Sequence, residues 1–114
     1  MSLHKIVFVG SYAEAEASGV RMYSFDEQEG TLSLLDEVKG LKNPTFLNVD
    51  VPNHKLYAIA EGVSEDGGKM GEAVAYAIEL NEGKGELREL NRKAAITASA
   101  CHIQRDANNR YVLL

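Results

Sequence analysis

The sequence lacks the features that mark several large classes of proteins. It contains one cysteine, Cys101, which excludes an internal disulfide framework and favours a reduced, cytoplasmic setting. Its 17 acidic residues outnumber its 12 basic ones, and the net charge of −5 argues against binding to nucleic acid or to an anionic membrane, since both need a basic surface. No apolar run approaches the roughly 20 residues of a membrane-spanning helix.

Motifs for cofactors and metals are also missing from the sequence. The Gly-rich segment 62–72 lacks the GxxxxGK[ST] pattern of a phosphate-binding loop. The histidines His4, His54 and His102 do not cluster with other ligand-type residues, so we expect neither a metal site nor a cofactor. The remaining composition, 45% hydrophobic and 25% charged, is ordinary for a globular chain.

What the sequence does contain is an internal repeat. Residues 43–58 align without a gap with residues 99–114, which places Leu47 on Ile103 and Asp50 on Asp106. Each copy has the pattern of a short apolar strand, a polar turn and a second apolar strand. Two further segments, 19–26 and 73–79, also resemble each other, and each is followed by a turn and Gly-x-Leu. Four-stranded repeats of about 40–50 residues are typical of β-propeller blades.

The pattern predicts three, four and two strands in chain order. Blade 1 is expected within residues 4–40 and blade 2 within 44–93, with strands near 45–50, 55–61, 73–80 and 86–92; a third blade begins at 100–114. The first blade then lacks its innermost strand, and the third lacks its outer strands. We therefore predict an all-β chain in which residues 1–114 form the N-terminal portion of one β-propeller domain, completed by further blades of the same chain. The alternative is a compact nine-stranded domain that ends at residue 114.

Several segments resemble the seven-bladed 6-phosphogluconolactonase family, which includes the carboxymuconate lactonising enzymes. They are Val7-Phe8-Val9-Gly10-Ser11-Tyr12, Asn43-Pro44-Thr45-Phe46-Leu47, residues 55–61 and Ala100-Cys101-His102-Ile103. Ala100 departs from the family, which usually has proline there. The resemblance implies about two blades of seven, and an enzyme that hydrolyses a sugar lactone, above all 6-phosphogluconolactone, by attack of water on the ring ester at the central channel. A muconate-type lactonising enzyme and a non-catalytic scaffold for protein partners are the alternatives.

Strand direction indicates which end of the sheets carries the site. Connections between blades share one face with the connections between the second and third strands of each blade. That face receives segments 13–18, 40–43, 62–72 and 98–100, whereas the opposite face receives tight turns at 26–30, 51–54, 81–84 and 108–109. Longer, Gly-rich loops favour the first face as the binding side.

His102 is the candidate catalytic residue at that face. It opens an innermost strand near the channel mouth, and a histidine can take a proton from water near neutral pH. A structural histidine bonded to a neighbouring blade is the alternative. Cys101 is not expected to act with it as a nucleophile, because adjacent residues of a strand point to opposite faces.

Glu61, Ser11 and Tyr12 are candidate substrate-binding residues because they end strands at the same face. Glu61 could act as a base or bind a sugar hydroxyl, and the other two could bind a polyol; solvated or packing roles are the favoured alternatives for all three. Arg105 and Asp106 are expected to make an ion pair or turn contacts. The cations that a substrate phosphate needs are expected from the remaining blades.

Overall fold

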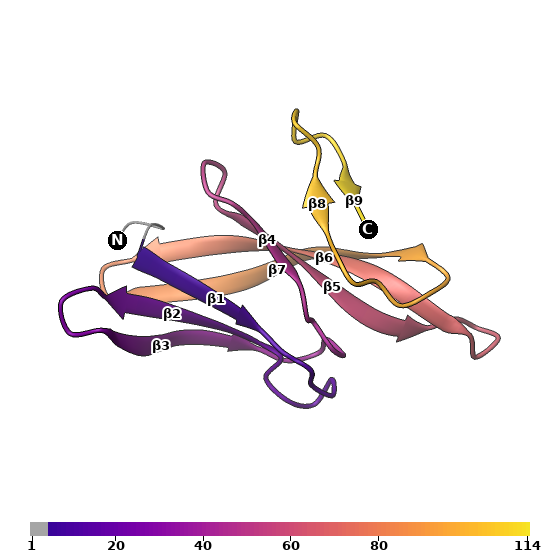
Figure 1. The fold of residues 1–114 in the computed structure, drawn as a ribbon, viewed down its shortest axis with the longest axis horizontal. Coiled ribbons are helices and arrows are strands. Elements are labelled where there is room, and N and C mark those ends of the chain that lie inside the picture. Colours follow the sequence, from indigo (N-terminus) through magenta and orange to yellow (C-terminus); the bar gives the residue numbers. More distant parts are fainter. Residues whose placement is uncertain (1–4) are drawn as a thin grey trace.

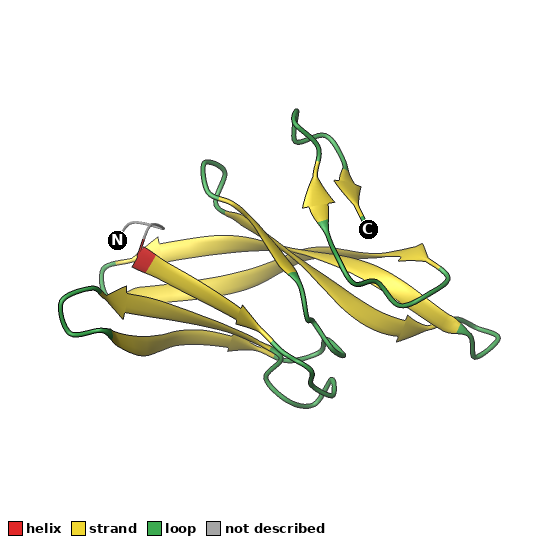
Figure 2. Cartoon of the chain, in the orientation of Figure 1, coloured by secondary structure: helices red, strands yellow, loops and turns green. Residues whose placement is uncertain are grey.

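The computed structural model describes residues 5–114, in which nine strands form three separate antiparallel sheets (Figure 1). The strand orders of the three sheets are β1-β2-β3, β4-β5-β6-β7 and β8-β9, which match the predicted three, four and two strands. Apart from one residue of 3₁₀ turn at Lys5, the described chain is strand, turn and loop (Figure 2). The strands are β1 Ile6–Gly10, β2 Val20–Asp26, β3 Thr31–Val38, β4 Leu47–Asp50, β5 Lys55–Val63, β6 Lys69–Asn81, β7 Lys84–Ile96, β8 Gln104–Arg105 and β9 Val112–Leu113.

The alternating pattern of the central sheet gives it one continuous apolar face. Leu56 and Ala58 of β5 are buried, and the register places them opposite Tyr76 and Val74 of β6, which are buried too. Residues two apart point to the same face of a sheet, so these side chains form a single layer. That layer packs against Val20, Met22 and other residues of the first sheet. Burying each Val, Leu or Met side chain of this core stabilises the fold by roughly 1.5–3 kcal/mol.

Polar contacts fix how the first two sheets lie against each other. The backbone N–H of Leu87 on β7 donates to the Asp36 carboxylate of β3 at 2.7 Å. The Arg92 guanidinium donates to the carbonyl of Gly40, just beyond β3, at 2.9 Å. At Gly10 an added Cβ would lie 2.3 Å from the carbonyl oxygen of Pro44, so only glycine permits this approach of the two backbones.

The β8–β9 hairpin lies on the opposite side of the central sheet from β1–β3 (Figure 1). Arg105 ties it there, donating to the Asn48 side chain at 2.6 Å and to the Val49 carbonyl at 3.1 Å, and lying 3.6 Å from the Asp50 carboxylate. The Asp106 carboxylate accepts hydrogen bonds from the backbone N–H groups of Arg110 and Tyr111, in the turn that follows β8. The predicted ion pair and turn contacts of Arg105 and Asp106 are therefore confirmed.

Several predicted boundaries are wrong: the strand expected at 86–92 runs from Lys84 to Ile96, the one expected at 45–50 begins at Leu47, and two segments differ more. The segment 62–72 is not one long loop, because β5 and β6 continue pairing through Gly62↔Met70 and leave only residues 64–68 as a turn. Gly71 serves close packing rather than flexibility, since an added Cβ would lie 2.7 Å from the Ala98 carbonyl oxygen.

The second error concerns the strand expected at 101–106, which is reduced to Gln104–Arg105. The register pairs Gln104 with Leu113, so residues 101 and 102 have no residue of β9 opposite them. His102 therefore precedes the strand instead of opening it. His4, at the expected start of blade 1, lies outside the described residues.

Candidate functional site

The loops predicted to share one face do come together there. The N–H of Asn43 donates to the Ala13 carbonyl at 2.8 Å, and the N–H of Ala13 donates to the Asn43 side-chain oxygen at 2.9 Å. The N–H of Glu61 donates to the Lys42 carbonyl at 2.9 Å. A cleft of about 400 Å³ lies among these loops, lined by Glu14, Lys42, Asn43, Glu61, Gly62, Val63, Gly67, Lys69 and Ser99.

Glu61 is the central acceptor of this cleft. Its two carboxylate oxygens accept hydrogen bonds from the Asn43 amide at 2.8 Å and from the Ser99 hydroxyl at 3.1 Å. Asn43 and Ser99 are equivalent positions of the internal repeat, so two successive copies hold one carboxylate between them.

These contacts keep Glu61 ionised. The hydrogen bond from Asn43 is the main cause that lowers the pKa of Glu61; burial opposes it, while the Ser99 hydrogen bond and the charges of Lys42 and Lys69 add to it. A carboxylate with a lowered pKa is a poor proton acceptor. Of the two roles considered for Glu61, the geometry favours accepting hydrogen bonds over acting as a base.

His102 packs against Phe46, with ring centroids 4.3 Å apart and planes inclined by 49°. These two residues are also repeat equivalents on successive sheets. In a radial arrangement of blades, equivalent positions approach each other most closely near the axis, so this contact marks the inner side of the sheets. His102 is exposed, as is Cys101, and neither lines the Glu61 cleft.

Ser11 and Tyr12 are not brought into the cleft. The Ser11 hydroxyl donates to the Gly19 carbonyl at 2.9 Å, and its N–H donates to the Pro44 carbonyl at 3.1 Å, so Ser11 fixes the loop between β1 and β2. Tyr12 is 87% exposed. Of the four predicted site residues, the structure brings Glu61 into the cleft and packs His102 against Phe46 outside it.

Sequence reasoning missed the partners of Glu61. Lys42, Asn43, Lys69 and Ser99 all belong to or adjoin segments that were assigned to the binding face. The repeat alignment of Asn43 with Ser99 was a further signal, because both residues precede the first strand of their copies and Glu61 ends a strand at the same face.

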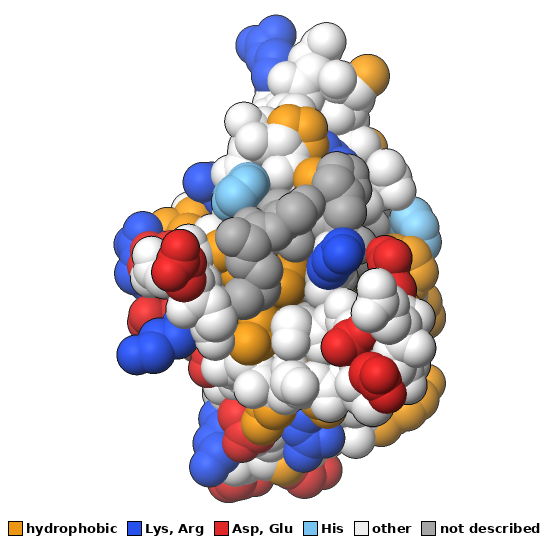
Figure 3. Space-filling model, turned by 90° about the vertical axis from the view of Figure 1, so that its left-hand side faces the viewer, with side chains coloured by type: hydrophobic (Ala, Val, Ile, Leu, Met, Phe, Trp, Pro, Cys, Tyr) orange, Lys and Arg blue, Asp and Glu red, His pale blue; other side chains and the backbone are white. Residues whose placement is uncertain are grey.

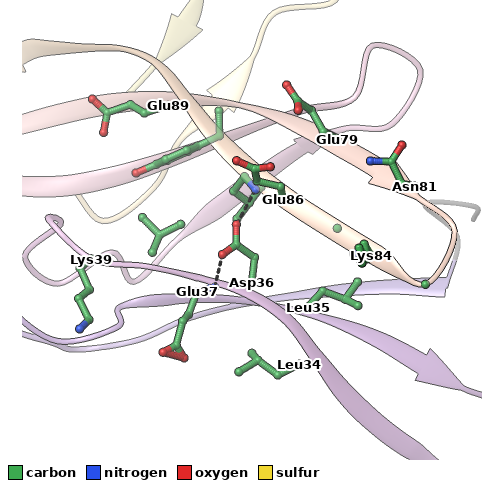
Figure 4. A pocket seen from close by; sticks show the side chains of 15 residues that line it. Leu34, Leu35, Asp36, Glu37, Lys39, Glu79, Asn81, Lys84, Glu86 and Glu89 are labelled. Atoms are coloured by element: carbon green, nitrogen blue, oxygen red, sulfur yellow. Dashed lines mark hydrogen bonds between the residues drawn. The ribbon is translucent and has the colours of Figure 1, made fainter.

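A larger groove, of about 640 Å³, opens between β3 and β7 (Figure 4). Carboxylates outnumber basic groups in its lining, with Glu37, Glu79 and Glu86 among them and Lys39 and Lys84 as the basic residues. Tyr76 also borders it, and burial raises the pKa of its hydroxyl. None of the predicted site residues lies here. The groove lies between the outer strands of two neighbouring sheets, and its size alone does not indicate a binding site.

The end of the molecule with the β2–β3 and β6–β7 turns shows acidic and basic side chains interspersed (Figure 3).

Among residues 5–114, no group of three or more His, Cys, Asp or Glu side chains is arranged to hold a metal ion. No helix in that part of the chain has the length and apolarity to cross a membrane.

Comparison with known proteins identifies the fold. The family described as "Lactonase, 7-bladed beta-propeller" matches residues 6–114. The 6-phosphogluconolactonase of Bacillus subtilis is 32% identical over 108 residues, which cover 95% of this chain and 29% of that protein. A Formosa agariphila protein of the same name is 24% identical over 107 residues, covering 93% of this chain and 29% of its own length.

A solved structure from Bacteroides fragilis, provisionally named 6-phosphogluconolactonase, superposes with a TM-score of 0.74 at 20% identity. The aligned region covers 98% of this chain and 30% of the Bacteroides fragilis chain. This likeness confirms the all-β propeller fold. The chain thus spans less than a third of the relatives that it matches, and by its match over residues 6–114 it belongs to the seven-bladed β-propeller lactonase family.

Proposed function

We propose that the complete protein hydrolyses a sugar lactone, with 6-phosphogluconolactone as the substrate that the names of its relatives suggest. The observation that carries this proposal is the family match over residues 6–114. In this arrangement the sheet β1-β2-β3 is the first blade, the sheet β4-β5-β6-β7 is the second and reaches Ile96, and 100–114 begins the third. Further blades close the channel.

His102 is proposed to activate the attacking water. Its imidazole is exposed on the inner side of the sheets and packs on Phe46. The repeat equivalent is apolar, so the fold does not need a polar side chain at this position. Water attacks the ring carbonyl carbon while the imidazole takes one of its protons, and the imidazolium then gives that proton to the ring oxygen as the ring C–O bond breaks. The products are a hydroxyl and a carboxylic acid, which ionises to the carboxylate. Donors for the developing oxyanion come from the rest of the channel.

Glu61 is proposed to orient the substrate by accepting hydrogen bonds from sugar hydroxyls. Ser99 touches Glu61 and lies three residues before His102, at most about 11 Å along the chain. One sugar-sized ligand can therefore contact both the cleft and the inner side. The lowered pKa of Glu61 leaves the proton transfer to His102.

The test is lactone hydrolysis by the purified complete protein, with His102→Gln as the key variant. Glutamine keeps a similar size and a hydrogen bond but cannot take the proton, so turnover is expected to fall by roughly 10²–10⁴-fold. His54→Gln is the matched control, because His54 is an exposed histidine in a turn on the opposite face. Thermal stability is measured for both variants.

Two outcomes would contradict the proposal. Absence of turnover on several aldonolactones would reject the enzyme and favour a protein-interaction scaffold. A His102→Gln rate within about threefold of wild type, well short of the range for a lost general base, would reduce His102 to a packing residue.

A further inference from the structure

We propose that Lys42 and Lys69 recognise the anionic group of a phosphorylated polyol bound in the Glu61 cleft. The inference rests on the proposed function and adds the residues that would select a phosphorylated lactone over an unphosphorylated one. It also revises the expectation that the cations for a substrate phosphate come from later blades alone.

The backbone on either side of Lys42 is firmly held. Leu41 is fully buried, and Asn43 makes two hydrogen bonds to Ala13. The Lys42 carbonyl accepts the N–H of Glu61, and the two residues form an isolated β-bridge. The exposed Lys42 side chain therefore starts from a fixed point at the wall of the cleft.

Strand pairing brings Lys69 to the lining of the same cleft. It is the first residue of β6 and lies opposite Val63, the last residue of β5. The turn between them is closed by its own hydrogen bonds, from the N–H of Ser64 to the Gly68 carbonyl and from the N–H of Gly67 to the Ser64 carbonyl. The two lysines thus belong to separate elements that the fold brings to one cleft.

Neither the Lys42 nor the Lys69 ammonium group forms a direct ion pair within residues 5–114. The ion pairs formed in that part of the chain involve arginines. Both lysines nevertheless act on Glu61, since their charges lower its pKa. The positive charges of Lys42 and Lys69 therefore act within the cleft, and both ammonium groups are available to bind an anionic ligand.

The mixture of charges narrows the ligand class. A free phosphate would meet the Glu61 carboxylate as well as the lysines, and a neutral sugar would make no use of the ammonium groups. A ligand with an anionic group at one end and hydroxyls along its length can pair the anion with Lys42 and Lys69 and donate hydroxyls to Glu61. The cleft, at about 400 Å³, is within the size range of small-molecule sites. A sugar phosphate has this combination of groups.

The experiment is calorimetric titration of the complete protein with 6-phosphogluconate, gluconate and inorganic phosphate. Gluconate carries the carboxylate and hydroxyls without the phosphate, so it separates the two anionic groups. Lys42→Ala/Lys69→Ala is expected to lose roughly 10–100-fold in affinity for 6-phosphogluconate, as for lost bonds to a charged group, with gluconate binding unchanged. The control, Lys84→Ala/Lys93→Ala, removes the same charge from exposed positions of β7 and should bind like wild type.

Several results would overturn the inference. They are no binding of 6-phosphogluconate by the wild type, an unchanged affinity in Lys42→Ala/Lys69→Ala, or an equal loss in the control. Inorganic phosphate binding as tightly as 6-phosphogluconate would reject the contribution of the hydroxyls.

The proposed function can fail separately. Lysine-dependent binding by a protein that hydrolyses no lactone would keep this inference and reject the enzyme. If Lys42→Ala/Lys69→Ala hydrolyses phosphorylated and unphosphorylated lactones in the wild-type ratio, the enzyme stands and this inference is rejected.

Discussion

The two copies of the repeat, residues 43–58 and 99–114, share a sequence skeleton but differ in how regular their hairpins are. In the first copy β4 and β5 belong to a four-stranded sheet, and Leu56 is fully buried. In the second, β8 and β9 pair over two residues each, and Val112, the equivalent of Leu56, is only partly buried. The first hairpin pairs with β6, whereas among residues 5–114 the second pairs with no further strand, so we attribute the regularity of the first to its outer strands. Isolated two-stranded hairpins are marginal for the same reason.

The copies agree where the turn needs a particular side chain. Asp50 accepts hydrogen bonds from Asn53, and Asp106 accepts them from Arg110 and Tyr111, so each aspartate caps its own turn. They differ at the start, where Phe46 in one copy meets His102 in the other. Packing is satisfied by the apolar residue in the first copy. The histidine in the second is therefore the better candidate for a residue retained for chemistry.

The largest expected effect tests whether outer strands complete the second copy in the complete protein. Leu56→Ala removes a fully buried side chain and should cost about 2–5 kcal/mol. If further strands cover the third sheet, the loss of stability in Val112→Ala should approach that of truncating a buried valine. It should be well above the loss expected for a partly exposed valine. Urea denaturation of both variants measures this. A negligible cost for Val112→Ala in the complete protein would mean that the second copy stays partly exposed and that no full third blade forms over it.

A smaller effect separates the two repeat equivalents that hold Glu61. Because the Asn43 hydrogen bond is the main cause of the lowered pKa, Asn43→Gly should return the Glu61 pKa further toward its ordinary value of 4.5 than Ser99→Ala does. Glycine is chosen because Asn43 has a φ of 51°. The lost hydrogen bonds should cost on the order of 1 kcal/mol. Carboxyl chemical shifts followed against pH would report the pKa, and a larger shift in Ser99→Ala would contradict the assignment.

The pH dependence of stability has a definite sign here. A folded-state pKa below the unfolded one means that ionised Glu61 stabilises the fold above pH 4.5, and that this contribution is lost as the pH falls through the folded value. Asn43→Gly removes the largest cause of the lowered pKa and so reduces that contribution. The difference in stability between wild type and Asn43→Gly should therefore narrow on acidification below pH 4.5.

The parts of this structure that the sequence predicted are those set by local patterns. Alternating apolar residues and turn residues predicted the number of strands and the face that collects the loops, because both depend on near neighbours. The hydrogen bond from Ser99 to Glu61 spans 38 positions and depends on how two sheets meet, which no local pattern specifies. Gly71 was expected within a loop at 62–72, because its role, the close approach of Ala98, is visible only in three dimensions. The catalytic role of His102 stays a prediction.

The smallest expected effect compares the turns of the two copies, where His54 and Asn109 have φ values of 52° and 54°. A left-handed backbone costs a residue with a Cβ roughly 1–2 kcal/mol, and glycine gives back about 0.5–1 kcal/mol of this in lost chain entropy. His54→Gly should therefore stabilise the protein by about 0.5 kcal/mol. Asn109→Gly should not, because asparagine tolerates this conformation and its side-chain oxygen accepts a hydrogen bond from Arg105 at 2.6 Å. His54→Ala, which keeps the Cβ, is the control and should bring no gain in the urea midpoint. Equal gains from both glycine substitutions would show that the Arg105 contact adds nothing to the second turn.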